Sequence, residues 1–354
     1  MNIKRFHENP LIKPSDVKPY HPDHEVIGVF NAGVATYKGE TLLLLRIAER
    51  PINHNPNTVK VSFIDFENRD GQLTVVELDK NDRRYDFSDP RSIYFHDPRR
   101  IAYLTSLSYI RIARSKDGKY FEIDDKPLIY PENEQESWGM EDPRVTQIGD
   151  TYYIQYSSIS PNGIGVGLIS TKDFIQFKRL GMMLHPQNKD VAIFPEKING
   201  KYYALHRPVP KDIGTPDIWL AESDNLIYWG NHQFLYGVNE NSWENGRVGG
   251  GAVPIRTEKG WLAIYHAADR NDRYCLGALL LDLNDPSKIL AKTDEPILEP
   301  EAPYEKEGFF GNVVFTCGVT KDGDDLTIYY GAADEYIAGA TVSLEEIMSN
   351  LNYR

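Results

Sequence analysis

The stretch Gly149-Asp150-Thr151-Tyr152-Tyr153-Ile154-Gln155-Tyr156 is the clearest indication of the fold, because it sets a tight turn directly before a run of strand-forming residues. Gly and Asp favour turns, whereas Thr, Tyr and Ile favour strands. The same arrangement occurs at four other places in the chain. These copies are Lys38-Gly39-Glu40 before residues 41–46, Asn199-Gly200-Lys201 before 202–207, Lys259-Gly260 before 261–266, and Asp322-Gly323-Asp324-Asp325 before 326–331.

The spacing of these turns indicates a repeated sheet. After the first copy they follow at intervals of about 50 to 65 residues, which suits a multi-strand unit such as a propeller blade. A second repeat, in which a strand, a polar turn and an aromatic residue follow one another, supports the first. Its copies are Ala113-Arg114-Ser115-Lys116-Asp117 before Phe121, Ile169-Ser170-Thr171-Lys172-Asp173 before Phe177, and Ala221-Glu222-Ser223-Asp224 before Trp229. The sequence therefore predicts an all-β fold, a closed ring of five blades, with a β-sandwich as the alternative.

Composition agrees with many short strands. Twelve per cent of the 354 residues are aromatic, and 27 Gly and 22 Pro supply turns. The one convincing helix is short and C-terminal, at residues 343–351, opened by the capping box Ser343-Leu344-Glu345-Glu346. Extra strands are expected at 59–66 and 72–78, within an insertion. No low-complexity linker divides the chain, so a single domain over residues 1–354 is expected.

Charge and composition exclude several classes of function. A net charge of −13 without a basic run argues against nucleic acid and anionic membranes, so any bound anion needs a local basic pocket. The N-terminus lacks the apolar stretch of a signal peptide and no run approaches the ~18 residues of a membrane span, which favours the cytoplasm. Cys275 and Cys317 are too few for a disulfide framework or zinc site, and are expected to be reduced and buried. No metal site is expected.

One short segment stands out for its chemistry: Trp138-Gly139-Met140-Glu141-Asp142-Pro143-Arg144-Val145. Two carboxylates and a guanidinium beside aromatic and thioether side chains cost free energy unless a ligand or a hydrogen-bond network uses them. The alternative is a turn capped by Asp142 and neutralised by Arg144. The same tripeptide recurs at Asp89-Pro90-Arg91 and Asp97-Pro98-Arg99, but without comparable surroundings.

A ring would bring polar residues together at the ends of its equivalent strands, around a central channel. Taken singly, a histidine at a strand end is more often structural than functional. The candidates at these ends are Arg46, Gln155, His206, Arg207, His266 and Asp334. Their joint placement favours a functional site.

Short motifs in order along nearly the whole chain carry a family resemblance. They are Asn31-Ala32-Gly33, Gly139-Met140-Glu141-Asp142-Pro143-Arg144, Phe194-Pro195-Glu196-Lys197, Leu205-His206-Arg207-Pro208, Trp229-Gly230, Trp243-Glu244-Asn245, Tyr265-His266, Leu280-Leu281-Asp282-Leu283, Asp285-Pro286-Ser287-Lys288 and Gly331-Ala332-Ala333-Asp334. The sequence resembles glycoside hydrolase family 130, the mannoside phosphorylases. The resemblance implies a five-bladed propeller with a central active site, in which Asp142 is the general acid and inorganic phosphate is the nucleophile.

This chemistry explains the residue types at the matched positions. Inverting cleavage needs an acid at the leaving oxygen and a nucleophile on the opposite face of the sugar. A hydrolase uses a carboxylate to activate water, whereas a phosphorylase needs cations that hold and aim phosphate. The resemblance assigns Lys189, Arg207 and Arg247 to phosphate. It assigns the sugar to Asn31, Arg46, Glu141, His206, His266 and Asp334, and Glu141 also orients Asp142. In the family the proton is thought to pass through a sugar hydroxyl.

The sequence thus predicts that a β-mannoside and phosphate become α-mannose 1-phosphate and a shortened sugar, with no cofactor. The segments 46–51 and 51–86 look most like members that act on β-1,2-mannobiose or short β-1,2-oligomannosides. β-1,4-mannosyl-glucose and β-1,4-mannooligosaccharides stay open, as do a β-mannosidase that uses water and a carbohydrate-binding propeller without catalysis. The oligomeric state is also open: the chain could form a homo-oligomer, with the insertion reaching a neighbouring subunit.

Overall fold

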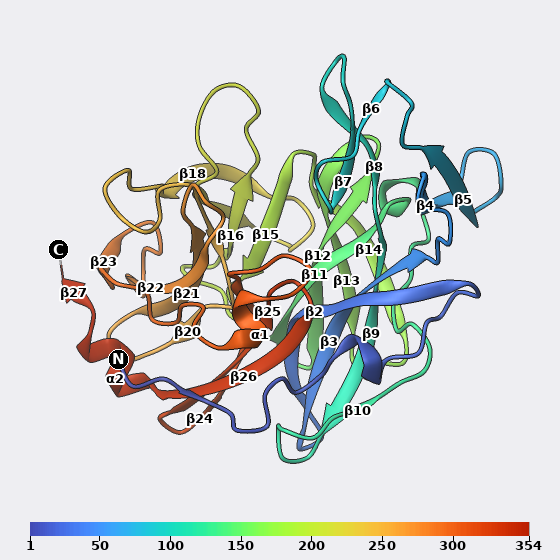
Figure 1. Ribbon diagram of the computed structural model, residues 1–354. Helices are drawn as coiled ribbons and strands as arrows, with labels where there is room; N and C mark the ends of the chain where they lie inside the picture. The colour runs from blue at the N-terminus through green and yellow to red at the C-terminus, as the bar shows by residue number, and fades with distance from the viewer. Residues whose placement is uncertain (354) are drawn as a thin grey trace.

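The computed structural model describes residues 1–353, and strands dominate them (Figure 1). Two short α-helices, Pro303–Lys306 (α1) and Leu344–Ser349 (α2), and two 3-10 turns, Pro14–Asp16 and Glu134–Glu136, accompany the strands. The Ser343 hydroxyl accepts a hydrogen bond from the Glu346 amide at 3.0 Å and caps α2. The predicted all-β class and the short C-terminal helix are therefore confirmed.

Outside residues 52–106, the antiparallel pairings divide the strands into five groups, and single parallel contacts join three of these groups into one 12-stranded sheet. The first group contains β2 (His24–Tyr37), β3 (Glu40–Pro51), β9 (Leu107–Ser115) and β10 (Glu122–Ile123), and the second β11 (Gly139–Ile148), β12 (Thr151–Ser160), β13 (Gly163–Thr171) and β14 (Phe177–Leu184). The third contains β15 (Asn188–Ile193), β16 (Tyr202–Pro208), β17 (Ile218–Ser223) and β18 (Gly230–Tyr236). The fourth contains β19 (Arg247–Gly250), β20 (Ile255–Arg256), β21 (Trp261–Ala268), β22 (Tyr274–Leu281), β23 (Ile289–Lys292) and β27 (Asn352–Tyr353). The fifth contains β24 (Val314–Asp322), β25 (Asp325–Ala332), β26 (Tyr336–Ser343) and the N-terminal β1 (Lys4–Arg5).

The N-terminal strand joins the fifth group, whereas the C-terminal strand β27 pairs with β23 in the fourth. Strand β1 pairs with β26, with Lys4 opposite Thr341 and Arg5 opposite Ala340. Single parallel contacts join neighbouring groups, between Gly33 of β2 and Cys317 of β24 and between Gly139 of β11 and Ser108 of β9. Because these backbones approach so closely, a Cβ on Gly139 would lie 2.8 Å from the Ser108 backbone. Only glycine fits there.

An insertion between β3 and β9 adds two small sheets. The hairpin of β4 (Thr58–Asp65) and β5 (Gln72–Asp79) lies where the sequence predicts extra strands, followed by β6 (Tyr85–Asp86), β7 (Ser92–Phe95) and β8 (Arg100–Leu104). These strands project from the upper right of the molecule in Figure 1. The insertion is therefore positioned beside the strands of the first two groups.

The predicted turn repeats correspond to real strand boundaries. Each of the five turns leads directly into a strand, namely β3, β12, β16, β21 and β25. In the second repeat a hydroxyl at the strand end accepts a hydrogen bond from the amide three residues on. The pairs are Ser115 with Gly118, Thr171 with Phe174 and Ser223 with Leu226. This local side-chain to backbone bonding explains why Ser and Thr end these strands.

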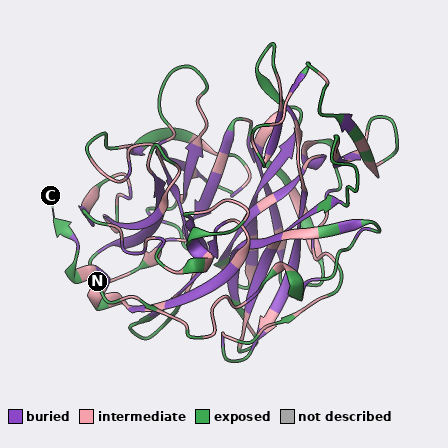
Figure 2. Cartoon of the chain, viewed as in Figure 1, coloured by how far each residue is buried: buried purple, intermediate pink, exposed green. Residues whose placement is uncertain are grey.

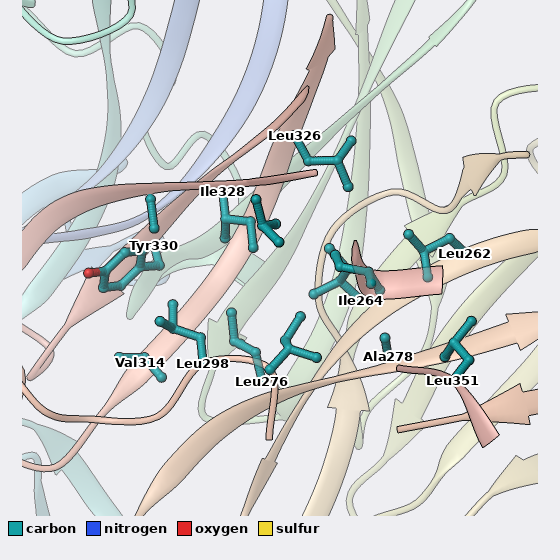
Figure 3. Packing of buried hydrophobic residues seen from close by; sticks show 14 of the residues in the cluster. Leu262, Ile264, Leu276, Ala278, Leu298, Val314, Leu326, Ile328, Tyr330 and Leu351 are labelled. Atoms are coloured by element: carbon teal, nitrogen blue, oxygen red, sulfur yellow. The ribbon is translucent and has the colours of Figure 1, made fainter. Parts of the chain in front are cut away.

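The core lies between the groups. Figure 2 shows burial concentrated along the strands and exposure in the connecting loops. Figure 3 shows one cluster, in which Leu262, Ile264 and Leu276 pack toward Val314 and Ile328. Each fully buried side chain of this size stabilises the fold by about 1.5–3 kcal/mol. Cys275 and Cys317 are free and buried, as expected. Among residues 1–353, none of the helices has the length and apolar character that crossing a bilayer requires.

Candidate active site

A cavity of about 290 Å³ lies where the five groups meet, and each group contributes to its wall. The insertion contributes as well, through residues of β7 and β8. Eight of the ten predicted site residues line the cavity: Asn31, Arg46, Glu141, Asp142, Lys189, Arg207, Arg247 and Asp334. Residues far apart in sequence therefore converge as the ring hypothesis requires.

Three β-bulges aim side chains at this region. In β2, β11 and β15 the pairing register shifts so that two residues stand against one on the neighbouring strand. The first residue of each bulge has a positive φ: 49° at Asn31, 49° at Asp142 and 56° at Asp190. Asn and Asp tolerate this conformation better than other side chains, which accounts for the residue types. A bulge re-aims the local side chains, and Glu141 and Asp142 consequently both face the cavity.

Arg46 holds the two carboxylates of this bulge. Its Nη1 donates to Asp142 Oδ1 at 2.9 Å and its Nη2 to Glu141 Oε1 at 2.7 Å. Its Nε donates to Ser108 Oγ at 3.1 Å, and its guanidinium lies over the Phe30 ring at 4.5 Å. With every edge of the guanidinium engaged, Arg46 fixes the orientation of both acids.

Asp142 is buried and ionised. Burial alone would raise its pKa, but the charges of Arg46, Lys189 and Arg144 outweigh burial and hold the pKa below its ordinary value. The Asn31 amide also donates to Oδ1 at 2.9 Å. Within residues 1–353 the second oxygen, Oδ2, has no hydrogen-bond partner. That oxygen is free to bind a ligand.

The pKa of Asp334 is shifted in the opposite direction from that of Asp142. Asp334 follows β25, has a φ of 51° and lines the same cavity. Burial raises its pKa to about 6, helped by the negative charge of Asp142 and opposed by Arg46 and Arg91. The cavity thus holds two carboxyl groups whose pKa values are moved apart.

Three cationic side chains lie on another part of the wall. Arg207 Nε approaches Asp190 Oδ2 to 2.9 Å as an ion pair, but without hydrogen-bond geometry. Both Nε and Nη1 of Arg207 are buried and have no hydrogen-bond partner within residues 1–353. Arg247 pairs with Asp272 and lies over the Tyr274 ring at 5.2 Å. In the described part of the chain Lys189 has no carboxylate within ion-pair distance. An anionic ligand would satisfy these donors.

Sequence reasoning missed Asp190, which organises the cationic wall. This carboxylate is buried, and it lies 2.9 Å from Arg207 Nε, 3.2 Å from His266 Nε2 and 3.4 Å from Arg144 Nη2. Burial would raise its pKa, but Arg207, His266 and Arg144 hold the pKa well below its usual range. A signal was present, because Asp190 precedes the Gly200 turn much as Asp142 precedes the Gly149 turn.

Neither His206 nor His266 lines the cavity, contrary to the sequence-based expectation of sugar contacts. The His206 ring is hydrogen-bonded to the Asn188 side chain and to the His232 ring, each at 3.0 Å. Burial lowers the pKa of His206 to about 3. His266 packs against the Phe315 ring, at 4.1 Å between centroids, and burial lowers its pKa to about 4. Adjacent strand residues point to opposite faces, so Arg207 and His206 cannot both face the cavity. Gln155 is likewise buried away from it.

Arg91 was also missed. The residues around Asp89-Pro90-Arg91 do not distinguish it, in the sequence, from the exposed copy at residues 97–99. Arg91 nevertheless lines the cavity, where its guanidinium stacks on the Phe310 ring at 4.0 Å and pairs with Asp89 at 3.2 Å. The insertion folds back to place it there. The remaining copy, with Arg99 paired to Asp86 at 2.9 Å, is exposed.

The sequence model of glycoside hydrolase family 130, described as β-1,4-mannooligosaccharide phosphorylase, matches residues 94–353. The chain belongs to this family. This family 130 chain is 54% identical over 352 residues to a β-1,2-mannobiose phosphorylase of Listeria innocua, covering 99% of each protein. It is 46% identical over 248 residues to a 1,2-β-oligomannan phosphorylase of Thermoanaerobacter sp., covering 69% of this chain and 81% of that protein.

A solved structure agrees with the family 130 assignment. The L. innocua β-1,2-mannobiose phosphorylase, in complex with β-1,2-mannobiose, superposes with a TM-score of 0.97 at 53% identity. The superposition covers 99% of both chains. The family 130 fold is therefore shared over the full length of the L. innocua enzyme.

Proposed function

We propose that this family 130 protein is an inverting phosphorylase that cleaves a β-1,2-linked mannoside with inorganic phosphate. The products are α-mannose 1-phosphate and a sugar shortened by one unit. The observation that carries the proposal is the cationic wall, Lys189, Arg207 and Arg247, in the same cavity as Asp142. Arg207 in particular holds buried donors without partners, as an oxyanion site requires.

The proposal extends to the architecture. The five antiparallel groups are blades of one ring-shaped domain, and the cavity is its centre. Support comes from the wall, to which every group contributes, and from the pairing of β1 with β26, which brings the first strand into the last group. The ring gathers charges from distant segments without long loops.

In the reaction a phosphate oxygen attacks C1 of the mannosyl unit from the α face. The bond from that oxygen to C1 forms while the bond from C1 to the glycosidic oxygen breaks, and the leaving oxygen takes up a proton. Asp142 supplies this proton through a hydroxyl of the sugar. Asn31, Arg46 and Asp334 hold the mannosyl unit, and Lys189, Arg207 and Arg247 hold the phosphate.

Phosphate binding also prepares the acid. The neighbouring cations, Lys189 among them, keep the pKa of Asp142 low. A bound phosphate offsets part of this positive charge, so the carboxylate gains a proton more readily. The proton donor is therefore ready when the nucleophile is in place.

The first test replaces the acid. Asp142→Asn keeps the size and the hydrogen bonds at Oδ1 but cannot donate the proton, and we expect phosphorolysis of β-1,2-mannobiose to fall by about 10²–10⁴-fold. The exposed Asp150→Asn is the matched control. Activity within tenfold of the parent would remove Asp142 from the role. Equal release of free mannose without phosphate would instead indicate a hydrolase, and parallel assays of β-1,4-mannosides would identify the linkage.

The second test concerns the anion. Arg247→Ala removes one charged donor from the phosphate wall, and a hydrogen bond to a charged group contributes about 1.5–3 kcal/mol. We expect the KM for phosphate to rise by about tenfold or more, with Arg256→Ala, at the exposed edge strand β20, as the control. An unchanged KM would mean that phosphate binds elsewhere.

A further inference from the structure

The Asp190 side chain touches the cationic wall from behind and is not among the residues that line the catalytic cavity. It belongs to the bulge of β15 and is 1% exposed. Its Oδ2 atom lies 2.9 Å from Nε of Arg207 and 3.2 Å from Nε2 of His266, and its Oδ1 atom lies 3.4 Å from Nη2 of Arg144. Burying a carboxylate is costly unless basic groups surround it, so these contacts fix where the Asp190 carboxylate lies.

Arg144 of β11 ties Asp190 to the backbone of two other strand groups. Its guanidinium is buried and donates to three backbone carbonyl oxygens. These are the oxygens of Asp142, 3.1 Å from Nη1, of Gly251, 2.9 Å from Nε, and of Gly250, 2.8 Å from Nη2. Gly250 is the last residue of β19, the strand that Arg247 begins. The acid bulge, the strand of Arg247 and the Asp190 carboxylate therefore share one support.

The backbone of β19 leaves the Asp190 carboxylate little room to move. A Cβ on Gly249 would lie 2.5 Å from Asp190 Oδ2 and 2.5 Å from His266 Nε2. Only glycine allows a backbone to approach a side chain so closely. The carboxylate is thus confined between β19 and the guanidinium groups of Arg144 and Arg207.

Asp190 contacts Arg207 at one edge of the guanidinium only. The ion pair is made at Nε, whereas Nη1 is buried without a hydrogen-bond partner within residues 1–353. Arg207 also lines the catalytic cavity. A guanidinium that is held at Nε keeps its terminal nitrogens for an oxyanion, and it loses less conformational freedom when the anion binds.

The charge of Asp190 taken alone would have the opposite effect on phosphate. A carboxylate near an anion site repels the anion, so removal of its charge should strengthen phosphate binding. A carboxylate that orients Arg207 should instead strengthen binding while it is charged. Because Arg144 and Arg207 already offset the charge of Asp190, we expect the repulsion to be the smaller of the two effects.

We infer that Asp190 is a positioning residue for phosphorolysis, which acts by orienting Arg207 toward the phosphate. The inference rests on the proposed function and deepens it, because it gives a carboxylate outside the cavity a part in binding the anionic co-substrate. The effect of orientation exceeds the repulsion between Asp190 and phosphate.

The test removes the charge of Asp190 and keeps its shape. Asp190→Asn should raise the KM for phosphate by about tenfold, as expected for one lost charge-assisted hydrogen bond, and leave the KM for β-1,2-mannobiose within about twofold. In an Arg207→Lys background no Nε edge remains to be held, so Asp190→Asn should then lower the KM for phosphate or leave it unchanged. Asp86→Asn, which removes a carboxylate from the pair with the exposed Arg99, is the matched control and keeps both KM values.

Three results would overturn the inference. They are an unchanged or lower KM for phosphate in Asp190→Asn, a parallel rise of both KM values, and an equal rise in the Arg207→Lys background. If Asp190→Asn does not fold, Gly249→Ala decides by the same two KM values, because its Cβ displaces the carboxylate from Arg207 and leaves the charge in place.

A failure of the proposed function gives a different result from a failure of this inference. If the parent shows no phosphate-dependent cleavage, the proposed function fails, and calorimetric titration with inorganic phosphate tests the role of Asp190 by itself. Weaker binding of phosphate by Asp190→Asn than by the parent supports the inference. Equal or tighter binding by the variant, or no binding by the parent, contradicts it.

Discussion

Asp142 and Asp334 share a cavity but carry protons over different pH ranges. Cations surround Asp142 and keep its pKa low, whereas partial burial with weaker compensation raises the pKa of Asp334 to about 6. Near neutral pH the Asp142 and Asp334 carboxylates therefore both carry a negative charge in this cavity, close to Arg46. A mannosyl hydroxyl that donates a hydrogen bond to Asp334 would reduce this repulsion. Binding that hydroxyl is therefore a function for the Asp334 carboxylate.

This arrangement predicts a pH-dependent stability. The pKa of Asp334 is about 6 in the folded protein against an ordinary value of 3.8, so the folded state binds more protons between these values. The free energy of unfolding consequently falls as pH rises from about 4 to about 6, by about 3 kcal/mol in total. Asp334→Asn removes this loss, and thermal unfolding without phosphate should show the variant more stable than the parent above pH 6. Parallel curves for the two proteins would contradict the pKa assignment.

Residue types predicted much of the site, but not which side of a strand each residue faces. Asp142, Lys189, Arg207 and Arg247 follow from motifs and charge, and the structure brings them to one cavity. His206 does not line this cavity. The Asp190 bulge lies opposite it, and the alternation of side chains along the strand turns Arg207 toward the cavity instead. Motifs alone contain no information about a bulge.

At the scale of elements, the turns were predictable and the bulges were not. A turn depends on a few neighbouring residues, such as Gly149-Asp150, so the sequence reveals it. A bulge depends on the register between two strands, which is set by long-range packing. The positive φ values at Asn31 and Asp142 are the local consequence of that register.

The bulge in β11 can be tested through its neighbour in β2. A Cβ on Gly33 would lie 2.7 Å from the Pro143 carbonyl oxygen, so Gly33→Ala must push the Asp142 bulge outward. We expect a loss of about 1–3 kcal/mol in the free energy of unfolding, together with reduced phosphorolysis. Gly230→Ala, where nothing lies within 4 Å of the new Cβ, is the matched control. Equal denaturant midpoints for the two variants would show that the bulge yields without cost.

In the molecule as a whole, the N-terminal strand β1 is bonded to the C-terminal part of the chain. Arg5 of β1 donates to Glu305 at 2.8 Å and to the Glu299 carbonyl oxygen at 2.7 Å. The Glu305 side chain is fully buried, so its charge depends on this partner. Sequence repeats predicted the groups, but nothing in residues 1–10 indicated a strand that completes the last of them.

Removing this partner should weaken the whole fold. Arg5→Ala leaves the buried Glu305 carboxylate without its cationic partner, and we expect a loss of about 3 kcal/mol in the free energy of unfolding. Arg84→Ala, which breaks an exposed pair with Asp82, should cost no more than about 1 kcal/mol. Urea unfolding followed by tryptophan fluorescence measures both. Similar midpoints for the two variants would mean that β1 is not required to hold the ends together.

The pairing of β1 with β26 also constrains biosynthesis. Lys4 leaves the ribosome early, but its partner Thr341 is made 337 residues later, so the first strand must wait through almost all of translation before it can dock. During that interval the emerging polypeptide carries an unpaired strand and an incomplete fifth sheet, which are surfaces that chaperones bind and proteases cut. The pairing of β1 with β26 can therefore form only when synthesis is nearly complete.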